Sequence, residues 1–173
     1  MEETKKKGLN TSSNSYTIIY SVVIVVLVAF LLAFVSSTLK PQQDENVALD
    51  KKKQILAALN IRDIDGAEAT EQYNKVVTAD MIINRDGTTI AKGEQGGTKT
   101  GFLCNCASTK EGKLALYVCN VDGQTKYVIP VYGMGLWGGI SGYIALNADK
   151  QTVYGAYFNH EGETAGLGAE IKD

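Results

Sequence analysis

An uninterrupted apolar run, Ile18 to Val35, constrains the fold of this chain more than any other feature. It contains no charged residue, and Ser21 is its only polar one. With Tyr16 before it and Ser36 to Thr38 after it, the stretch reaches about 20 residues, which lets a helix cross the hydrocarbon core of a bilayer. A cleavable signal peptide is the alternative, but its apolar core is usually about 7 to 15 residues long. We therefore predict a permanent transmembrane helix over residues 16–38.

The placement of lysines gives an orientation. Lys5, Lys6 and Lys7 precede the apolar run, whereas Lys40 and then the acidic Asp44 follow it. Because cytoplasmic flanks carry an excess of lysine and arginine, residues 1–15 are expected to be cytoplasmic. The difference is small, since three further lysines lie at 51–53.

The remaining residues, 41–173, are enough for one compact domain with its own core. The formal net charge is −2, and the lysines are scattered along the chain. These features argue against nucleic-acid binding, which needs a basic patch or stripe. The three cysteines, Cys104, Cys106 and Cys119, lack the spacing of a zinc site, so we predict no metal site. Buried structural thiols are favoured over a disulfide.

Local patterns predict an α+β domain with a mostly antiparallel sheet and flanking helices. Apolar residues at helical spacing indicate a helix over 44–60 with a solvated lysine-rich face, and a second short helix is expected over 66–73. Three turns then separate strand-like segments, at Asn84–Gly87, Asp122–Gly123 and Asn147–Lys150. Asp-Gly pairs between alternating apolar segments are typical of β-hairpins.

The glycine-rich stretch Gly93–Gly101 resembles a phosphate-binding loop only superficially. That pattern requires glycine directly before the lysine, and Thr98 stands before Lys99 here. We expect a flexible surface connection.

Two other glycine-rich segments carry the functional interpretation, namely Gly133–Gly142 and Gly162–Gly168. Such segments cannot pack a core, but their backbone N–H groups can approach a flat or anionic ligand closely. Trp137 in the first segment is either a core aromatic or a ligand contact. His160, the only histidine, leaves a hydrolase as a weak alternative, although no Gly-x-Ser-x-Gly elbow is present.

These segments resemble a known family. The stretch Gly135-Leu-Trp-Gly-Gly-Ile-Ser-Gly-Tyr-Ile-Ala-Leu146, followed by His160-Glu-Gly-Glu-Thr-Ala-Gly-Leu-Gly-Ala-Glu170, is similar to the FMN-binding domain of NqrC, the C subunit of the sodium-translocating NADH:quinone reductase. The N-terminal anchor agrees with it. The G subunit of the related Rnf electron-transport complex shares the second motif, but Gly-Leu-Trp favours the NqrC branch. An extracytoplasmic docking domain without a cofactor is the remaining alternative.

The resemblance implies a set of flavin-contacting residues and no catalytic residue. The loop would be formed by Glu163, Thr164, Gly166, Leu167 and Gly168, and Leu136 with Trp137 would lie near the edge of the flavin ring. Ala165 stands where the family usually has proline, which reduces the rigidity of the loop but leaves its backbone donors.

In the family, FMN is attached through its phosphate to a threonine of a Ser/Thr-Gly-Ala-Thr type motif downstream of this loop. No such motif occurs before Asp173, so the covalent FMN threonine is absent from this sequence. The chain is either truncated or a member that cannot hold FMN covalently. We expect a truncation, with the FMN-binding domain at 41–173 incomplete at its C-terminus.

The resemblance also implies a function. FMN would relay electrons from an iron–sulfur centre towards the flavin of the B subunit, in a complex that couples NADH oxidation and ubiquinone reduction to sodium export. The B, D and E subunits would be neighbours. The protein would cross the cell inner membrane once, with its bulk on the periplasmic side, and this chain alone would not oxidise NADH.

Overall fold

A computed structural model describes residues 13–104, 112–135, 138–160 and 162 of the 173-residue chain. The chain divides into two compact units, Met1–Asn46 and Val47–Asp173. Helix α1, Asn14–Ala58, contributes its first part to the first unit and its last turns to the second.

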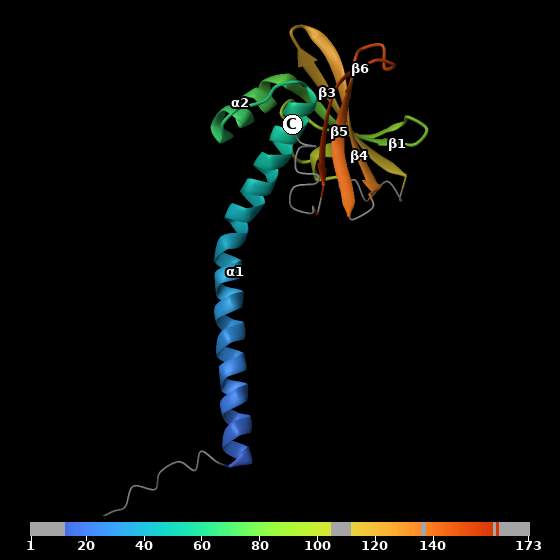
Figure 1. The fold of residues 1–173 in the computed structure, drawn as a ribbon. Coiled ribbons are helices and arrows are strands. Elements are labelled where there is room, and N and C mark those ends of the chain that lie inside the picture. The colour runs from blue at the N-terminus through green and yellow to red at the C-terminus, as the bar shows by residue number, and fades with distance from the viewer. Residues whose placement is uncertain (1–12, 105–111, 136–137, 161, 163–173) are drawn as a thin grey trace, which may run out of the picture. The chain divides into compact units, whose positions relative to one another are not determined.

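The first unit contains the long first part of α1 (Figure 1). Because the apolar run is uninterrupted over 18 residues, Ile18 to Val35, it covers all sides of this helix. The large side chains from Ile18 to Val35 are exposed, and none of the most apolar window is buried against other described residues. A helix that is apolar all round needs either a protein core or lipid around it. By length and composition, α1 can therefore cross a membrane.

The sequence predicted two helices where the structure has one. The segment expected to begin at Asp44 continues α1, which passes through Pro41 without a break and ends at Ala58. Proline lacks a backbone N–H and so removes one helical hydrogen bond. The helix finally ends where Asn60 adopts a left-handed conformation, with φ of 60°, a typical helix C-terminal geometry.

In the second unit, two helical segments pack on one face of the sheet. The last turns of α1 bury Ile55, Leu56 and Ala58, and helix α2, Gly66–Val76, buries Ala69, Tyr73 and Val76. The spacing of four and three residues in α2 places one apolar stripe against the sheet. The predicted short helix is confirmed and extends three residues further.

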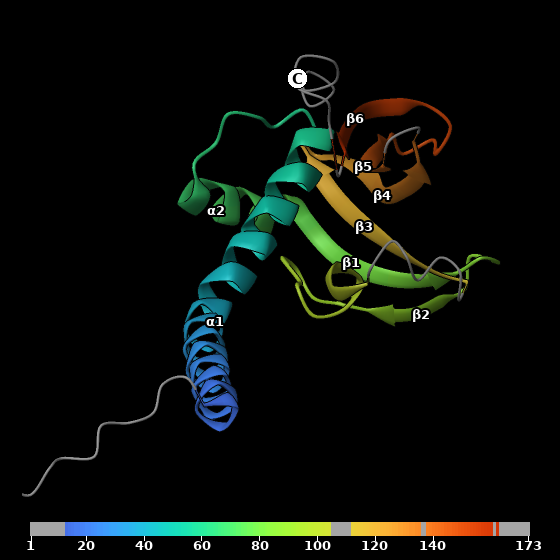
Figure 2. The same ribbon diagram turned by 60° about the horizontal axis from the view of Figure 1, so that its bottom comes forward.

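The sheet of the described residues has six antiparallel strands in the order β2-β1-β3-β4-β5-β6 (Figure 2). Their bounds are β1 Val77–Asn84, β2 Thr89–Lys92, β3 Lys113–Val121, β4 Gln124–Met134, β5 Gly139–Leu146 and β6 Val153–His160. A short 3₁₀ turn, η1 (Gly101–Leu103), precedes β3. The expected α+β fold with a mostly antiparallel sheet is confirmed.

All three predicted turns join neighbouring strands. Asn84–Gly87 connects β1 to β2, Asp122–Gly123 connects β3 to β4, and the 147–150 turn connects β5 to β6. In the last turn, the Asp149 carboxyl accepts hydrogen bonds from the backbone N–H groups of Gln151 and Thr152, both 3.0 Å long.

The core lies between the two helical segments and the sheet. Tyr117 and Cys119 of β3 are fully buried there, together with Val128 of β4. The Tyr117 and Tyr143 rings meet edge to face at 6.2 Å. Cys119 is a buried thiol, as the alternation of its strand predicted, while Cys106 lies outside the described residues.

Candidate functional site

The turn between β4 and β5 marks the candidate site. The last pair of these strands is Met134 with Gly139, and beyond it the Gly135 N–H donates a 2.8 Å hydrogen bond to the Gly138 carbonyl. Leu136 and Trp137 are the two residues inside this turn and lie outside the described part of the chain. Their flanking backbone is thereby fixed at one end of the sheet.

The start of the second glycine-rich segment reaches the same end of the sheet. Antiparallel pairing of β5 with β6 places Ile140 opposite His160. Two residues later, the backbone nitrogen of Gly162 lies 3.7 Å from the position that a Cβ atom on Gly138 would take. The strand pairing therefore brings together two segments that are more than 20 residues apart in the sequence.

The other predicted ligand residues cannot be placed. Glu163, Thr164, Gly166, Leu167 and Gly168 all lie outside the described residues, and their assignment remains a prediction. The described structure fixes only the point at which their segment begins.

The glycines at this end of the sheet serve different purposes. A side chain at Gly133 or Gly162 would meet no atom within 4 Å, so the space beside their backbones is open. A Cβ on Gly142 would instead overlap the Tyr157 carbonyl, so that glycine permits close strand packing. Only some of the glycines of the first segment therefore leave backbone accessible to a ligand.

A pocket of about 370 Å³ lies beside the turn; we call it the turn pocket. Its floor includes Tyr132 and Ser141, which pair directly across β4 and β5 two steps from the turn. Alternate residues of a strand share a face, so Tyr132 lies on the same face as buried Val128. The pocket's lining is completed by residues of α1, of η1 and the position after it, and of β5: Val47, Asp50, Lys51, Gln54, Leu103, Cys104, Gly142 and Tyr143.

Apolar side chains are exposed around this pocket. Val47 is 68 % exposed, Leu103 70 % and Tyr132 50 %, and Met134, two residues beyond Tyr132 on the same strand, is 79 % exposed. Open apolar surface beside a concave site with a few polar groups is typical of a ligand or partner site.

Lys51 brings a positive charge to the turn pocket. Its ammonium group donates a hydrogen bond to the Phe102 carbonyl and lies 4.7 Å from the centroid of the Phe102 ring. The neighbouring Lys52 lies 5.7 Å from the Tyr73 ring centroid. The prediction of a merely solvated lysine face was therefore wrong, because two of these lysines lie over aromatic rings of the core.

Sequence reasoning also missed Asp80 of β1. Asp80 is fully buried, and its Oδ2 accepts the backbone N–H groups of Thr100 (2.9 Å) and Phe102 (3.0 Å). The stretch Gly93–Gly101 wraps around this carboxyl group, so the expected flexible surface connection is instead packed on Asp80. The signal in the sequence was an acidic residue within a strand, 13 residues before the glycine-rich stretch that begins at Gly93.

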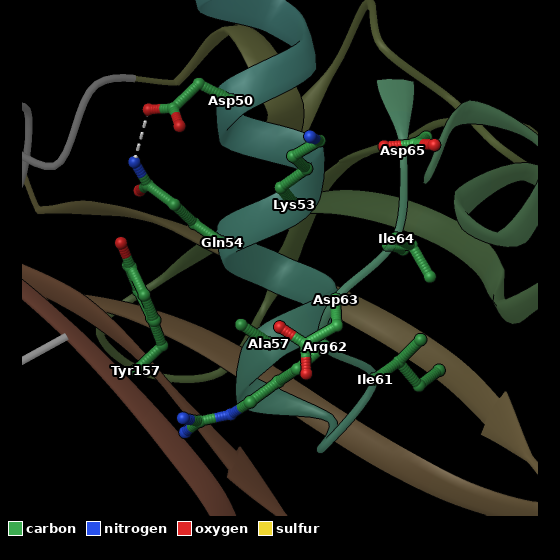
Figure 3. A pocket seen from close by; sticks show the side chains of 10 residues that line it. All are labelled: Asp50, Lys53, Gln54, Ala57, Ile61, Arg62, Asp63, Ile64, Asp65 and Tyr157. Atoms are coloured by element: carbon green, nitrogen blue, oxygen red, sulfur yellow. Dashed lines mark hydrogen bonds between the residues drawn. The ribbon is translucent and has the colours of Figure 1, made fainter. Parts of the chain in front are cut away.

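A second pocket, of about 530 Å³, shares Gln54 with the turn pocket (Figure 3). It contains Lys53 of α1, Arg62 and Asp63 of the following segment, and Tyr157 of β6. Asp50 and Gln54 line both pockets and are joined by a 2.7 Å hydrogen bond. The second pocket is polar and carries both signs of charge, and no residue of β4 is among its described lining.

His160 and the acidic side chains form no metal site that the structure describes. Within residues 13–104, 112–135 and 138–160, no group of three or more His, Cys, Asp or Glu side chains is placed to hold a metal ion. The His160 backbone N–H donates to the Asn159 side chain at 3.0 Å, at the end of β6.

Known proteins similar to this chain point to one family. No family model matches the chain. The C subunit of the Na(+)-translocating NADH-quinone reductase of Pseudomonas aeruginosa is 29 % identical, over 94 % of this chain and 69 % of that protein. The corresponding protein of Haemophilus ducreyi is 32 % identical, over 77 % of this chain and 57 % of that protein.

A solved structure agrees. The crystal structure of the C subunit of the Na(+)-translocating NADH-quinone reductase of Parabacteroides distasonis matches with a TM-score of 0.69 and 37 % identity. The match covers 78 % of this chain and 64 % of that one. The chain thus spans roughly three-fifths to two-thirds of the length of these proteins.

Proposed function

We propose that this chain, which is similar to the C subunits of the Na(+)-translocating NADH-quinone reductases, belongs to the NqrC family and is a membrane-anchored component of such an oxidoreductase complex. Its role there is to hold FMN at the end of the sheet where β4 and β6 finish and β5 begins. The observation that carries this proposal is the convergence of the Gly135–Gly138 turn with the segment that begins at Gly162.

The residues present at this end of the sheet fit a flavin. The turn pocket, at about 370 Å³, falls within the range of small-molecule sites, about 300 to 1,000 Å³. Its lining combines aromatic and aliphatic surface with the Tyr132 and Ser141 hydroxyls and one ammonium group. Open space beside Gly133 and Gly162 leaves backbone exposed to a flat ligand.

In this proposal, Leu136 and Trp137 lie at the edge of the flavin ring. The loop of Glu163, Thr164, Gly166, Leu167 and Gly168 supplies backbone donors. A bound flavin supplies electron transfer, and the protein sets its position, its exposure to water and its surrounding charge.

The proposed setting is the cell inner membrane. Residues 1–15 are cytoplasmic, residues 16–38 span the bilayer, and residues 41–173 form the extracytoplasmic FMN-binding domain. A flavin held by this domain would supply the relay of electrons from an iron–sulfur centre towards the flavin of the B subunit, with the B, D and E subunits as neighbours, in a complex that couples this transfer to sodium export. α1 supports a single span because it is long and apolar enough.

Flavin binding tests the proposal directly. The full chain is purified in detergent and titrated with FMN, and binding is followed by quenching of flavin fluorescence. Non-covalent FMN is the appropriate probe because the attachment motif of the family is absent from the sequence. We expect Trp137→Ala to weaken binding about tenfold and to alter the flavin absorption band, because an aromatic contact at the ring is lost.

Val153→Ala is the matched control, since this exposed residue of β6 lies at the opposite end of the strand from His160. Equal effects of the two substitutions would remove Trp137 from the site. A wild-type chain that binds no FMN would favour the alternative of a docking domain without a cofactor. Its partner surface would then be the exposed apolar side chains around the turn pocket, Val47, Leu103, Tyr132 and Met134.

A further inference from the structure

We propose that Lys51 of α1 sets the relative affinity of the site for reduced and oxidised flavin. This inference rests on the proposed function, since it concerns a flavin seated in the turn pocket. The ligand class is a planar heteroaromatic ring that gains negative charge on reduction. Nothing in the motif pattern indicates Lys51, because it lies in a helix about 85 residues before the first glycine motif.

The position of the Lys51 ammonium group is fixed from two sides. It donates to the Phe102 carbonyl and lies over the Phe102 ring, while the N–H of the same residue donates to buried Asp80 at 3.0 Å. The Phe102 ring is itself held edge to face against Tyr73, with centroids 5.8 Å apart. Lys51 is therefore tied to a buried anchor, and its charge cannot swing freely into solvent.

The electrostatic environment makes this charge effective. Lys51 is half-buried, and the pocket that it lines also contains the apolar surface of Val47, Leu103 and two tyrosines. A flat ligand seated against this surface displaces water and so reduces the screening of the charge. A fixed positive charge stabilises a ring that becomes more negative on reduction, so it strengthens binding of the reduced form more than that of the oxidised form.

One opposing charge lies in the same pocket. The Asp50 carboxyl lines the turn pocket next to Lys51 and accepts a hydrogen bond from Gln54. Asp50 and Lys51 are the only residues of formal charge in the pocket's described lining. Neutralising Lys51 should therefore lower the affinity for reduced relative to oxidised flavin, and neutralising Asp50 should raise it. Two opposite effects are a stronger test than the loss of one charge.

The experiment measures two dissociation constants for each protein. Full-length protein in detergent is titrated anaerobically with oxidised FMN and with dithionite-reduced FMN. The phosphate group is common to both ligands, so its contribution largely cancels in the ratio. The variants are Lys51→Gln, which keeps a donor for the Phe102 carbonyl, Lys51→Arg, which keeps the charge, and Asp50→Asn.

Lys53→Gln is the matched control. Lys53 has the same charge and lies two residues away on α1, but it lines the second pocket (Figure 3). We expect Lys51→Gln to lower the preference for reduced FMN by about threefold to tenfold, as for a unit charge near a partly screened site. Lys51→Arg and Lys53→Gln should leave the ratio unchanged, and Asp50→Asn should raise it.

The outcomes separate this inference from the proposed function. If FMN binds but Lys51→Gln leaves the ratio unchanged, or Lys53→Gln shifts it equally, the inference is overturned and the proposed function stands. If wild-type protein binds no FMN in either state, both are overturned. If Lys51→Gln does not fold, Asp50→Asn decides: a raised preference for reduced FMN supports the inference, and an unchanged one overturns it.

Discussion

Asp80 shows how a single buried carboxyl group organises a glycine-rich segment. One of its oxygens accepts two backbone N–H groups, and the other has no hydrogen-bond partner among the described residues. Cα–H groups can provide weak hydrogen bonds, and at Gly93 and Gly97 a side chain would overlap this second oxygen. Both glycines are therefore required for close approach of the backbone.

Gly93→Ala is expected to destabilise the protein by at least about 2 kcal/mol, because its new methyl group would displace the Asp80 carboxyl. Urea unfolding followed by circular dichroism measures the loss. Gly133→Ala is the control, since a side chain there meets no atom within 4 Å. Similar midpoints for the two variants would contradict the described packing.

Asp80→Ala is expected to cost about 2 to 4 kcal/mol, because it leaves the Thr100 and Phe102 N–H groups buried without their acceptor. Asp80→Ala also removes the carboxyl group that the new methyl group of Gly93→Ala would overlap. Unfolding of the double variant with Gly93→Ala should therefore cost less than the sum of the single changes. Strict additivity would show that the two residues do not touch.

Burial raises the pKa of the Cys119 thiol to about 12. At pH 8 we expect iodoacetamide to alkylate it at least about a hundredfold more slowly in folded than in urea-unfolded protein, since the thiolate is the reactive form. Mass mapping of the labelled peptide measures the ratio. Equal labelling in both states would contradict burial.

The same shift has a consequence for stability. Because the folded pKa is raised, the stabilising contribution is complete below the ordinary thiol value of 9.0 and is lost as pH rises towards 12. Cys119→Ala should therefore flatten the decline of unfolding free energy over this alkaline range. Tyr73, whose pKa burial also raises, contributes its own decline and remains in both proteins.

At the scale of elements, hairpins determine which segments meet. The β3–β4 turn has φ of 51° at Asp122 and 79° at Gly123, and two successive positive values are typical of the turn that matches the twist of paired strands. Gly123→Ala should cost about 1 kcal/mol, because alanine rarely adopts this conformation. Thermal unfolding against the Gly133→Ala control measures the difference, and no loss would contradict the turn geometry.

The β4–β5 and β5–β6 pairings have a functional consequence. Each antiparallel connection reverses the chain, so β4 and β6 run in the same direction and finish at the same end of the sheet. The Gly135–Gly138 turn and Gly162 meet there because of this topology. Hairpin signals predicted the connections, and the register of pairing then fixed the distance.

At the scale of the whole molecule, the two units expose different surfaces: the described part of the first exposes mainly apolar side chains, and the second buries its own core. A chain that begins at Gln43 lacks the apolar run but keeps the turns of α1 that bury Ile55 and Leu56 in the core. We expect this shortened protein to be soluble without detergent and to unfold cooperatively, whereas the full chain requires detergent. Size-exclusion chromatography with and without detergent measures this, and aggregation of the shortened form would contradict an independently folded second unit.

Much of this organisation follows from the sequence, because the relevant interactions are local. The apolar run, the short helix Gly66–Val76 and the three turns each depend on residue types within a few positions. The continuity of α1 through Pro41 could not be predicted in this way, because the sequence signals for a helix end compete with the propensities on both sides.

By itself, the sequence determined the apolar run, the α+β class with its hairpins, and the two glycine motifs that resemble a flavin-binding family. Only the tertiary structure decided that Asp80 anchors the Gly93–Gly101 stretch and that Lys51 lines the turn pocket. The physical reason is the separation along the sequence over which the interactions act. Periodicity and turn chemistry depend on residues that are neighbours in the chain. Burial of a carboxyl group, or the placement of an ammonium group over a ring 51 residues away, depends on how distant segments pack.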